Sequence, residues 1–238
     1  VSARTIESLG KIGNESALDE VTESQSAGGS AYLNAERALS VARFAIRGLK
    51  NEQSIWFCFE QLAHSSADVR WKALFALWRS APHGLINIES AKRESLLTHL
   101  AMDPDVDVRQ NLVTLLGRSR PSYARDIVRS MQAEDRKNPN WQVEVHLVRT
   151  IAALSSSEPE MLNDLIEYLG ASNDHVRIAA LLAFSGLSRA TVDASADTMK
   201  LRQELTRLAN TKSPSAEVAR GEAFVALAKL FPEDFSRK

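Results

Sequence analysis

The sequence predicts an all-α fold, an α-solenoid in which antiparallel helix pairs stack into a right-handed superhelix. Three observations predict it: one short pattern recurs along the chain, its apolar residues have a helical period, and almost no segment alternates like a strand. The composition agrees, because 44% hydrophobic and 25% charged residues are typical of a globular protein. With only 10 Gly and 7 Pro, the chain is excluded from the fibrous and disordered classes.

The recurring pattern is most complete from Asp103 to Gly117. Each copy has a small apolar anchor residue, and the anchors are separated by 39, 35, 33 and 43 residues. Further apolar or small residues recur at or near +4, +7, +8 and +11 from the anchor, which places them on one face of a helix at 100° per residue. We call these the B helices. Their anchors are Val69, Val108, Val143, Val176 and Ala219.

Two more B helices are expected near the start of the chain. Residues 1–12 fit the same pattern, and residues 30–49 fit it from either Ala31 or Ala38, as a longer helix would. Pro104, Pro139 and Pro214 stand just ahead of B helices, where a residue without an N–H suits a helix start. Six A helices are expected between them, over residues 15–25, 52–63, 89–101, 122–133, 159–169 and 198–210.

These helices organise residues 1–238 as a single array of about six helix pairs after a leading half-repeat. One pair cannot bury both of its apolar stripes, so each pair must stack on its neighbours. Longer connections are expected over residues 24–30, 80–87 and 188–197. The chain begins with Val and with half of a structural unit, so we expect it to be an excised piece of a longer protein.

The pattern from Asp103 to Gly117 resembles that of HEAT repeats, in the variant first described in phycobilisome lyases. That variant reads D-P-x-x-x-V-R-x-x-A-x-x-x-L-G, and partial copies cover nearly the whole chain. The resemblance implies a HEAT-like solenoid whose B helices line a concave face. It implies a binding scaffold rather than a particular chemistry, because such arrays occur in many unrelated proteins.

The concave face is where a binding site is expected. Positions +2, +6 and +9 of a B helix project at about 200°, 240° and 180° from the anchor, away from the A helix. In one helix these are Trp71, Phe75 and Trp78. The other B helices carry smaller or aliphatic residues and one arginine there: Gln110, Thr114 and Gly117; Val145, Arg149 and Ala152; Ile178, Leu182 and Ser185.

Arginines accompany the aromatic residues, with Arg79 and Arg118 at +10 of adjacent B helices and Arg149 at +6 of the next. Aromatic and arginine side chains dominate many interfaces. The surface therefore suits an acidic, partly apolar peptide or a partner helix. The predicted partner-binding residues are Trp71, Phe75, Trp78, Arg79, Gln110, Thr114, Arg118 and Arg149. The alternative is that the rings pack under the connection 80–87 or against a neighbouring domain.

A second set of charges recurs at the B-helix starts. An arginine follows four of the anchors, with an acid one to three residues before it. Such charges link adjacent repeats or favour the helix dipole, so we expect a structural charge ladder and no ligand site. Its members are Arg70, Arg109, Arg177 and Arg220 with Asp68, Asp107, Asp174 and Glu217.

No catalytic motif is recognisable. The sequence has no glycine-rich phosphate loop, GxSxG, HExxH or CxxC, and Cys58 lies in an apolar run that favours an inert buried thiol. The histidines lack ligand spacing: His64, His83, His99, His146 and His175. We therefore expect no enzymatic activity, no metal and no cofactor, and interpret the chain as a non-catalytic scaffold for a protein or peptide partner.

Two other functions remain open. Some HEAT-like arrays resemble DNA glycosylases that hold a duplex in a groove, but the inner positions here contain no Asp and the formal charge of the chain is −1. A chromophore-lyase-like subunit follows from the repeat variant alone. A cytoplasmic location without membrane contact is expected, because there is one cysteine, no signal peptide and no apolar segment of bilayer length.

Overall fold

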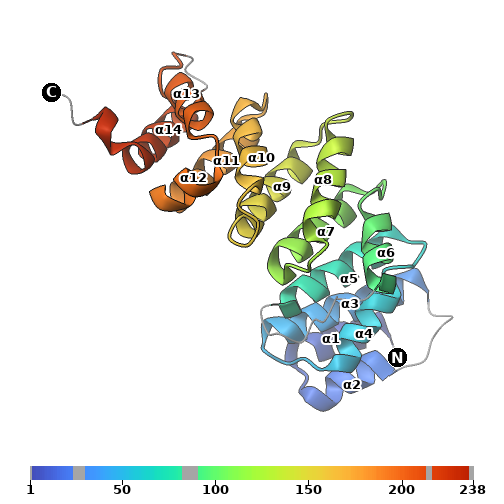
Figure 1. Cartoon of the computed structure of the whole chain (residues 1–238). Helices are drawn as coiled ribbons and strands as arrows, with labels where there is room; N and C mark the ends of the chain where they lie inside the picture. The colour runs from blue at the N-terminus through green and yellow to red at the C-terminus, as the bar shows by residue number, and fades with distance from the viewer. Residues whose placement is uncertain (1, 24–29, 82–90, 213–215, 236–238) are drawn as a thin grey trace. The chain divides into compact units, whose positions relative to one another are not determined.

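The computed structural model describes residues 2–23, 30–81, 91–212 and 216–235. Within these ranges every regular element is a helix, and no residue forms a strand. Helices α1 to α11 alternate between the B and A types that the sequence predicts, and α13 and α14 continue the alternation after an additional helix, α12 (Figure 1). The predicted fold class is confirmed.

The B helices agree with the predicted pattern, and α3, with 16 residues, is the longest of them. Every anchor is buried, with at most 3% of its surface exposed, and so is every residue at +4 from an anchor. The bounds of the B helices are α1 Ala3–Ile12, α3 Ala31–Ile46, α5 Ala67–Ser80, α7 Val106–Ser119, α9 Trp141–Leu154, α11 Asp174–Gly186 and α14 Glu217–Leu230.

The A helices occupy the six predicted segments with small differences at their ends. Their bounds are α2 Glu15–Glu23, α4 Glu52–Gln61, α6 Ala91–Leu100, α8 Ala124–Asp135, α10 Met161–Glu167 and α13 Thr198–Ala209. Two 3-10 turns, Tyr168–Gly170 and Pro232–Asp234, follow α10 and α14.

The connection expected over 188–197 is largely helical, which corrects the sequence-based expectation of a loop. It contains α12, Arg189–Ser195. Ser188 caps this helix by accepting a hydrogen bond from the Thr191 amide at 3.1 Å, and Val192 is fully buried. The expected connections at 24–30 and 80–87 lie almost entirely outside the described residues, as does Pro214.

Side-chain caps fix where several B helices begin. The Asp105 carboxylate accepts from the Val108 amide at 3.0 Å, and the Asn140 side chain accepts from the Gln142 and Val143 amides. Each cap comes directly after a proline, Pro104 or Pro139, so the proline stands outside the helix and the polar residue starts it.

The contacts divide the chain into two compact units, residues 1–134 and 135–238. In the first unit, α1, α3, α5 and α7 pack side by side in chain order (Figure 1). In the second, α11 packs between α9 and α14. Each unit is thus a stack of B helices backed by A helices.

The leading helix α1 is attached at close range. Gly10 packs against α3, where an added Cβ would lie 2.6 Å from the Ser40 hydroxyl oxygen. That hydroxyl donates to the Ile6 carbonyl at 2.9 Å, and Arg47 donates to the Gly13 and Gly10 carbonyls at the end of α1. The half-repeat is therefore held by backbone contact as well as by apolar packing.

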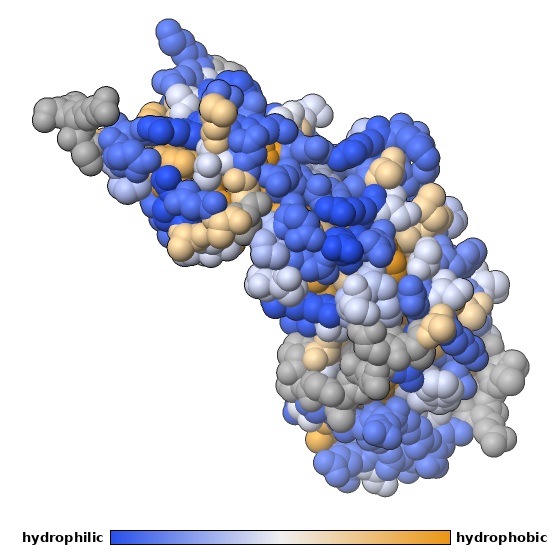
Figure 2. All heavy atoms as spheres, in the orientation of Figure 1, coloured by the Kyte–Doolittle hydropathy of each residue, from blue (hydrophilic) through white to orange (hydrophobic). Residues whose placement is uncertain are grey.

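Polar residues cover most of the surface turned to the viewer in Figure 2, and hydrophobic residues there form small separate patches. In the described ranges, no helix is long and apolar enough to cross a membrane.

Candidate partner-binding surface

The three predicted aromatic residues lie together on α5, and we call them the aromatic face. Trp71 and Phe75 have ring centroids 6.5 Å apart at an interplanar angle of 70°, and Phe75 and Trp78 are 5.1 Å apart at 89°. Both are edge-to-face contacts, which aromatic pairs prefer. All three side chains are half-buried, so the rings are neither sealed in the core nor fully in solvent.

The aromatic face extends to the next B helix through a hydrogen bond. The Trp78 indole Nε1–H donates to the Asn111 side-chain oxygen on α7 at 2.8 Å. Asn111 in turn donates to the Asp107 carbonyl at 2.8 Å, which fixes the orientation of its amide. The Trp78 ring is therefore held by two helices.

Two arginines stack on this ring. The Cζ of Arg79 lies 4.2 Å from the Trp78 centroid and 5.0 Å from that of Phe75, and the Cζ of Arg118 lies 4.7 Å from Trp78. Neither guanidinium pairs with a carboxylate in the described part of the chain, and the Arg79 Nε is buried without an acceptor. We call Arg79 and Arg118 the arginine pair.

The cation at the other end of the aromatic face has acidic partners. The Lys72 ammonium lies 5.5 Å from the Trp71 centroid and pairs with Asp68 at 3.0 Å and Glu36 at 3.7 Å. The two ends of α5 therefore differ in charge balance.

The other predicted partner-binding residues are Gln110, Thr114 and Arg149. Gln110 and Thr114 are half-buried on α7, where the Thr114 hydroxyl donates to the Gln110 carbonyl at 2.9 Å. Arg149 is exposed on α9 in the second unit, and its charge, after burial, contributes to lowering the pKa of His146. Gln110 and Thr114 thus share the first unit with the aromatic face, and Arg149 belongs to a separate unit.

The arginines of the predicted ladder use different partners. Arg70 makes a bidentate ion pair with Asp103, at 2.7 and 2.9 Å, and also donates to the His64 and Ser65 carbonyls. Arg109 donates to the Asp103 carbonyl at 2.6 Å. Asp68, the acid just before Arg70, pairs with Lys72 instead.

In the second unit the corresponding arginine pairs within its own helix. Arg177 bonds to the Asp174 carboxylate and donates to the Ser172 carbonyl at 3.0 Å. On α14, Arg220 is half-buried and Glu217 is exposed. Asp107 is exposed on α7. Sequence reasoning named neither Asp103 nor Asn111 as a partner. Position +3, which Asn111 shares with Lys72, lies on the border toward the neighbouring B helix and is the signal that could have found it.

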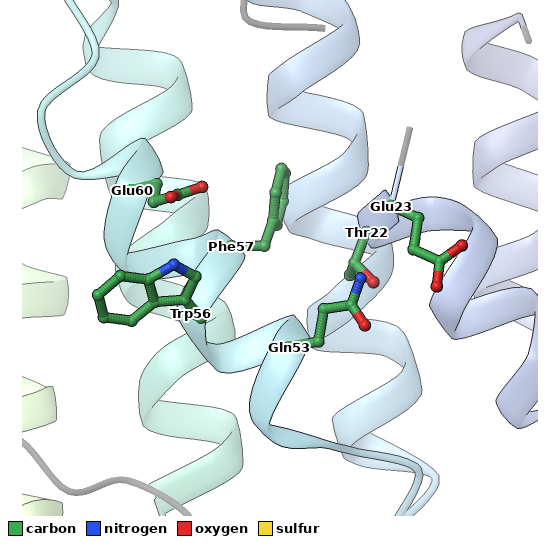
Figure 3. A pocket seen from close by; sticks show the side chains of 6 residues that line it. All are labelled: Thr22, Glu23, Gln53, Trp56, Phe57 and Glu60. Atoms are coloured by element: carbon green, nitrogen blue, oxygen red, sulfur yellow. The ribbon is translucent and has the colours of Figure 1, made fainter. Parts of the chain in front are cut away.

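A polar pocket of about 420 Å³ lies on the A-helix side (Figure 3). Exposed Glu60 of α4 and exposed Glu23 of α2 contribute carboxylates, which suit a cation. The indole of Trp56 is already stacked by Arg93 at 5.4 Å, and exposed carboxylates are screened by water. We therefore assign no ligand to it. Its lining is Thr22, Glu23, Gln53, Trp56, Phe57 and Glu60.

The structure brings no catalytic or metal-binding group into a recognisable site among the described residues. Cys58 is buried, and burial raises the pKa of its thiol far above the ordinary value, so the thiolate nucleophile is disfavoured. No group of three or more His, Cys, Asp or Glu in the described ranges could hold a metal ion.

Comparisons with known proteins agree with the helical repeat fold. Residues 93–185 match the family model of HEAT repeats. An archaeal HEAT-like repeats protein from Thermococcus onnurineus NA1 is similar in structure, with 13% identity, a TM-score of 0.56 and coverage of 97% of this chain and 98% of that one. A search of curated proteins finds no match.

Engineered and designed proteins are also similar in structure. One has 16% identity and a TM-score of 0.63, covering 90% of this chain and 96% of its own. A designed armadillo repeat protein in complex with the peptide (KR)4 has 16% identity and a TM-score of 0.51, covering 97% and 100%. At these identities the likeness shows the fold, which is a helical repeat solenoid.

Proposed function

We propose that this array of HEAT-like repeats is a non-catalytic scaffold that binds a protein or peptide partner through the concave face lined by its B helices. The aromatic face on α5 is the centre of the proposed site. A cytoplasmic location belongs to the same proposal.

The observation that carries the proposal is the half-buried aromatic face with two arginines stacked on Trp78. Aromatic side chains bury a large area at a small cost in conformational entropy, and tryptophan and arginine are enriched among the residues that dominate interfaces. The edge contact with Phe75 and the hydrogen bond to Asn111 hold Trp78 in place, so little further ordering is needed on binding.

The comparison with designed armadillo proteins supports the type of ligand. One such protein was solved with the peptide (KR)4, so a fold of this kind can hold a short peptide. Its peptide is basic, whereas the arginine pair here favours an acidic one. The chromophore-lyase alternative has no described residue to support it.

Selection from a random peptide display library tests the proposal. We expect the chain to enrich peptides that bind it with about micromolar affinity by calorimetry, and the Trp71→Ala/Trp78→Ala variant to bind them at least about tenfold more weakly. Trp141→Ala on α9 is the matched control, because this tryptophan is 44% exposed and lies outside the aromatic face.

Circular dichroism separates binding from packing. We expect the double variant to keep its helical signal and its melting temperature within about 5 °C, since its rings are only half-buried. If the library yields no binder, or if the double variant binds as the parent does, the proposal is wrong. If the variant unfolds, the rings serve packing.

A further inference from the structure

We infer that the arginine pair Arg79 and Arg118 recognises a carboxylate side chain of the bound peptide, so that the partner is an acidic peptide with apolar residues beside its acids. This inference rests on the proposed function and names the chemistry of the ligand.

The first step is the distribution of charges on the B helices of the first unit. Toward α1 and α3 the cations have acidic partners, because Arg43 pairs with Glu7 and Glu36, and Lys72 pairs with Glu36 and Asp68. Toward α7 no acid accompanies the arginine pair in the part of the chain that the structure describes. Among the described residues, the cations toward α1 and α3 are paired with acids and the arginine pair is not.

The second step is the position of the guanidinium groups. Both lie over the face of the Trp78 ring, at 4.2 and 4.7 Å from its centroid. A planar guanidinium stacked on a ring uses its face for that contact and keeps the N–H groups along its edge, where a carboxylate binds. A contact with the ring face does not use up the N–H donors, so they can still bind a carboxylate.

The third step is the partial exclusion of water. The Arg79 Nε has almost no contact with solvent and no hydrogen-bond acceptor, and the side chain as a whole is half-buried. Charge interactions are stronger where water is partly excluded than at a fully exposed site. An acid that reaches this guanidinium gains more than it would at an isolated surface arginine.

The surroundings favour a peptide over a nucleic acid. A phosphodiester backbone needs a continuous track of cations, but the acids Asp68 and Glu36 lie beside Lys72 at the start of α5. Trp71 and Phe75 offer apolar contact area between the two ends. An acidic side chain at the arginine pair with an apolar side chain on the rings satisfies both parts of the surface.

The experiment uses NMR of the ¹⁵N-labelled chain, whose four tryptophans give separate indole signals that single Trp→Phe variants assign. The probes are capped octapeptides of alternating Glu and Phe, Gln and Phe, or Lys and Phe, and a single-stranded DNA of twelve nucleotides. We expect the Glu peptide to shift the Trp78 signal and leave Trp56 and Trp141 unchanged. We expect the Gln peptide to bind at least tenfold more weakly, and the Lys peptide not to bind.

The decisive variant is Arg79→Gln/Arg118→Gln. We expect it to bind the Glu peptide at least tenfold more weakly and the Gln peptide as the parent does. The control Arg4→Gln/Arg125→Gln removes the same charge elsewhere, on α1 and α8, and should stay within about twofold of the parent. Unchanged Trp56 and Trp141 signals and an unchanged dichroism spectrum establish that each variant is folded.

Other outcomes separate this inference from the proposed function. Equal binding of the Glu and Gln peptides would overturn the carboxylate assignment and leave the aromatic face as a binding site. Tighter binding of the DNA, with a steep dependence on salt, would overturn it in favour of phosphate. If library peptides bind but none shifts Trp78, the inference is wrong; if no peptide binds at all, the proposed function is wrong as well.

Discussion

The two units of the chain share one repeat template and differ in what they place on its inner positions. In the first unit, positions +2, +6 and +9 of α5 hold Trp71, Phe75 and Trp78. The same positions of α11 in the second unit hold an isoleucine, a serine and Leu182, which is 53% exposed. The anchors are buried alike in both units. The anchor positions are therefore alike in the two units, whereas the residues at +2, +6 and +9 differ.

The ion pair made by the arginine after the anchor also differs between the two units. Arg70 reaches Asp103 beyond its own repeat, whereas Arg177 pairs with Asp174 in its own helix. The Arg70–Asp103 side chains are 13% and 6% exposed, compared with 19% and 42% for Arg177–Asp174. One sequence position thus makes a buried link between repeats in one unit and a surface pair in the other.

The largest expected effect comes from breaking these two pairs separately. Asp103→Ala leaves Arg70 buried without its partner, and we expect the free energy of unfolding to fall by about 3–5 kcal/mol. Asp174→Ala should cost at most about 1 kcal/mol, because its pair is partly in solvent. Urea unfolding measures both. Equal losses in the two variants would remove the distinction between the units.

Core truncation gives the next largest effect. Leu116→Ala and Leu147→Ala each remove a fully buried side chain, from α7 and α9, and each should cost about 2–5 kcal/mol. Hydrogen exchange should show lost protection in α5 as well as α7 for the first variant, and in α11 as well as α9 for the second. Loss confined to the mutated helix would contradict the shared core between neighbouring repeats.

A smaller effect is expected at the two aromatic contacts between B helices. Asn111→Ala removes the acceptor of the Trp78 indole and should cost about 1 kcal/mol. In the second unit, Trp141 stacks on His175 at 5.0 Å, and His175→Ala should cost about 0.5 kcal/mol because this indole is 44% exposed. Thermal unfolding compares them. A larger loss of stability for His175→Ala than for Asn111→Ala would contradict the expectation that Trp78 is held more strongly than Trp141.

The smallest expected effect is a dependence on pH in the second unit. Burial and the Arg149 charge lower the pKa of His146, so the folded chain favours its neutral form. The unfolded chain binds this proton more readily, and stability therefore decreases as pH falls below about 6.5. His146→Gln should reduce the loss of melting temperature between pH 7.5 and 5.5 by about 2 °C. An unchanged pH profile would show that His146 does not contribute.

The helical order and the buried faces could be predicted because a period of 3.6 residues separates Val69, Ala73 and Leu77 from the inner positions. The partners of the charged residues could not. The lysine or arginine nearest to Asp103 in the sequence is Arg109. Only the stacking of helices brings the Asp103 carboxylate to Arg70. Helix α12 was missed because Val192 is its one contribution to the core among the described residues, which gives no periodic apolar pattern.

The close contact between Gly10 and Ser40 makes a commonly stabilising substitution, glycine to alanine in a helix, unfavourable here. In most helices, replacing glycine by alanine stabilises the chain by up to about 1 kcal/mol, since glycine has more freedom in the unfolded state. Here the new methyl group would lie 2.6 Å from the Ser40 hydroxyl oxygen and would push α1 away from α3. A consensus redesign that places alanine at this position would therefore weaken the packing of α1 on α3.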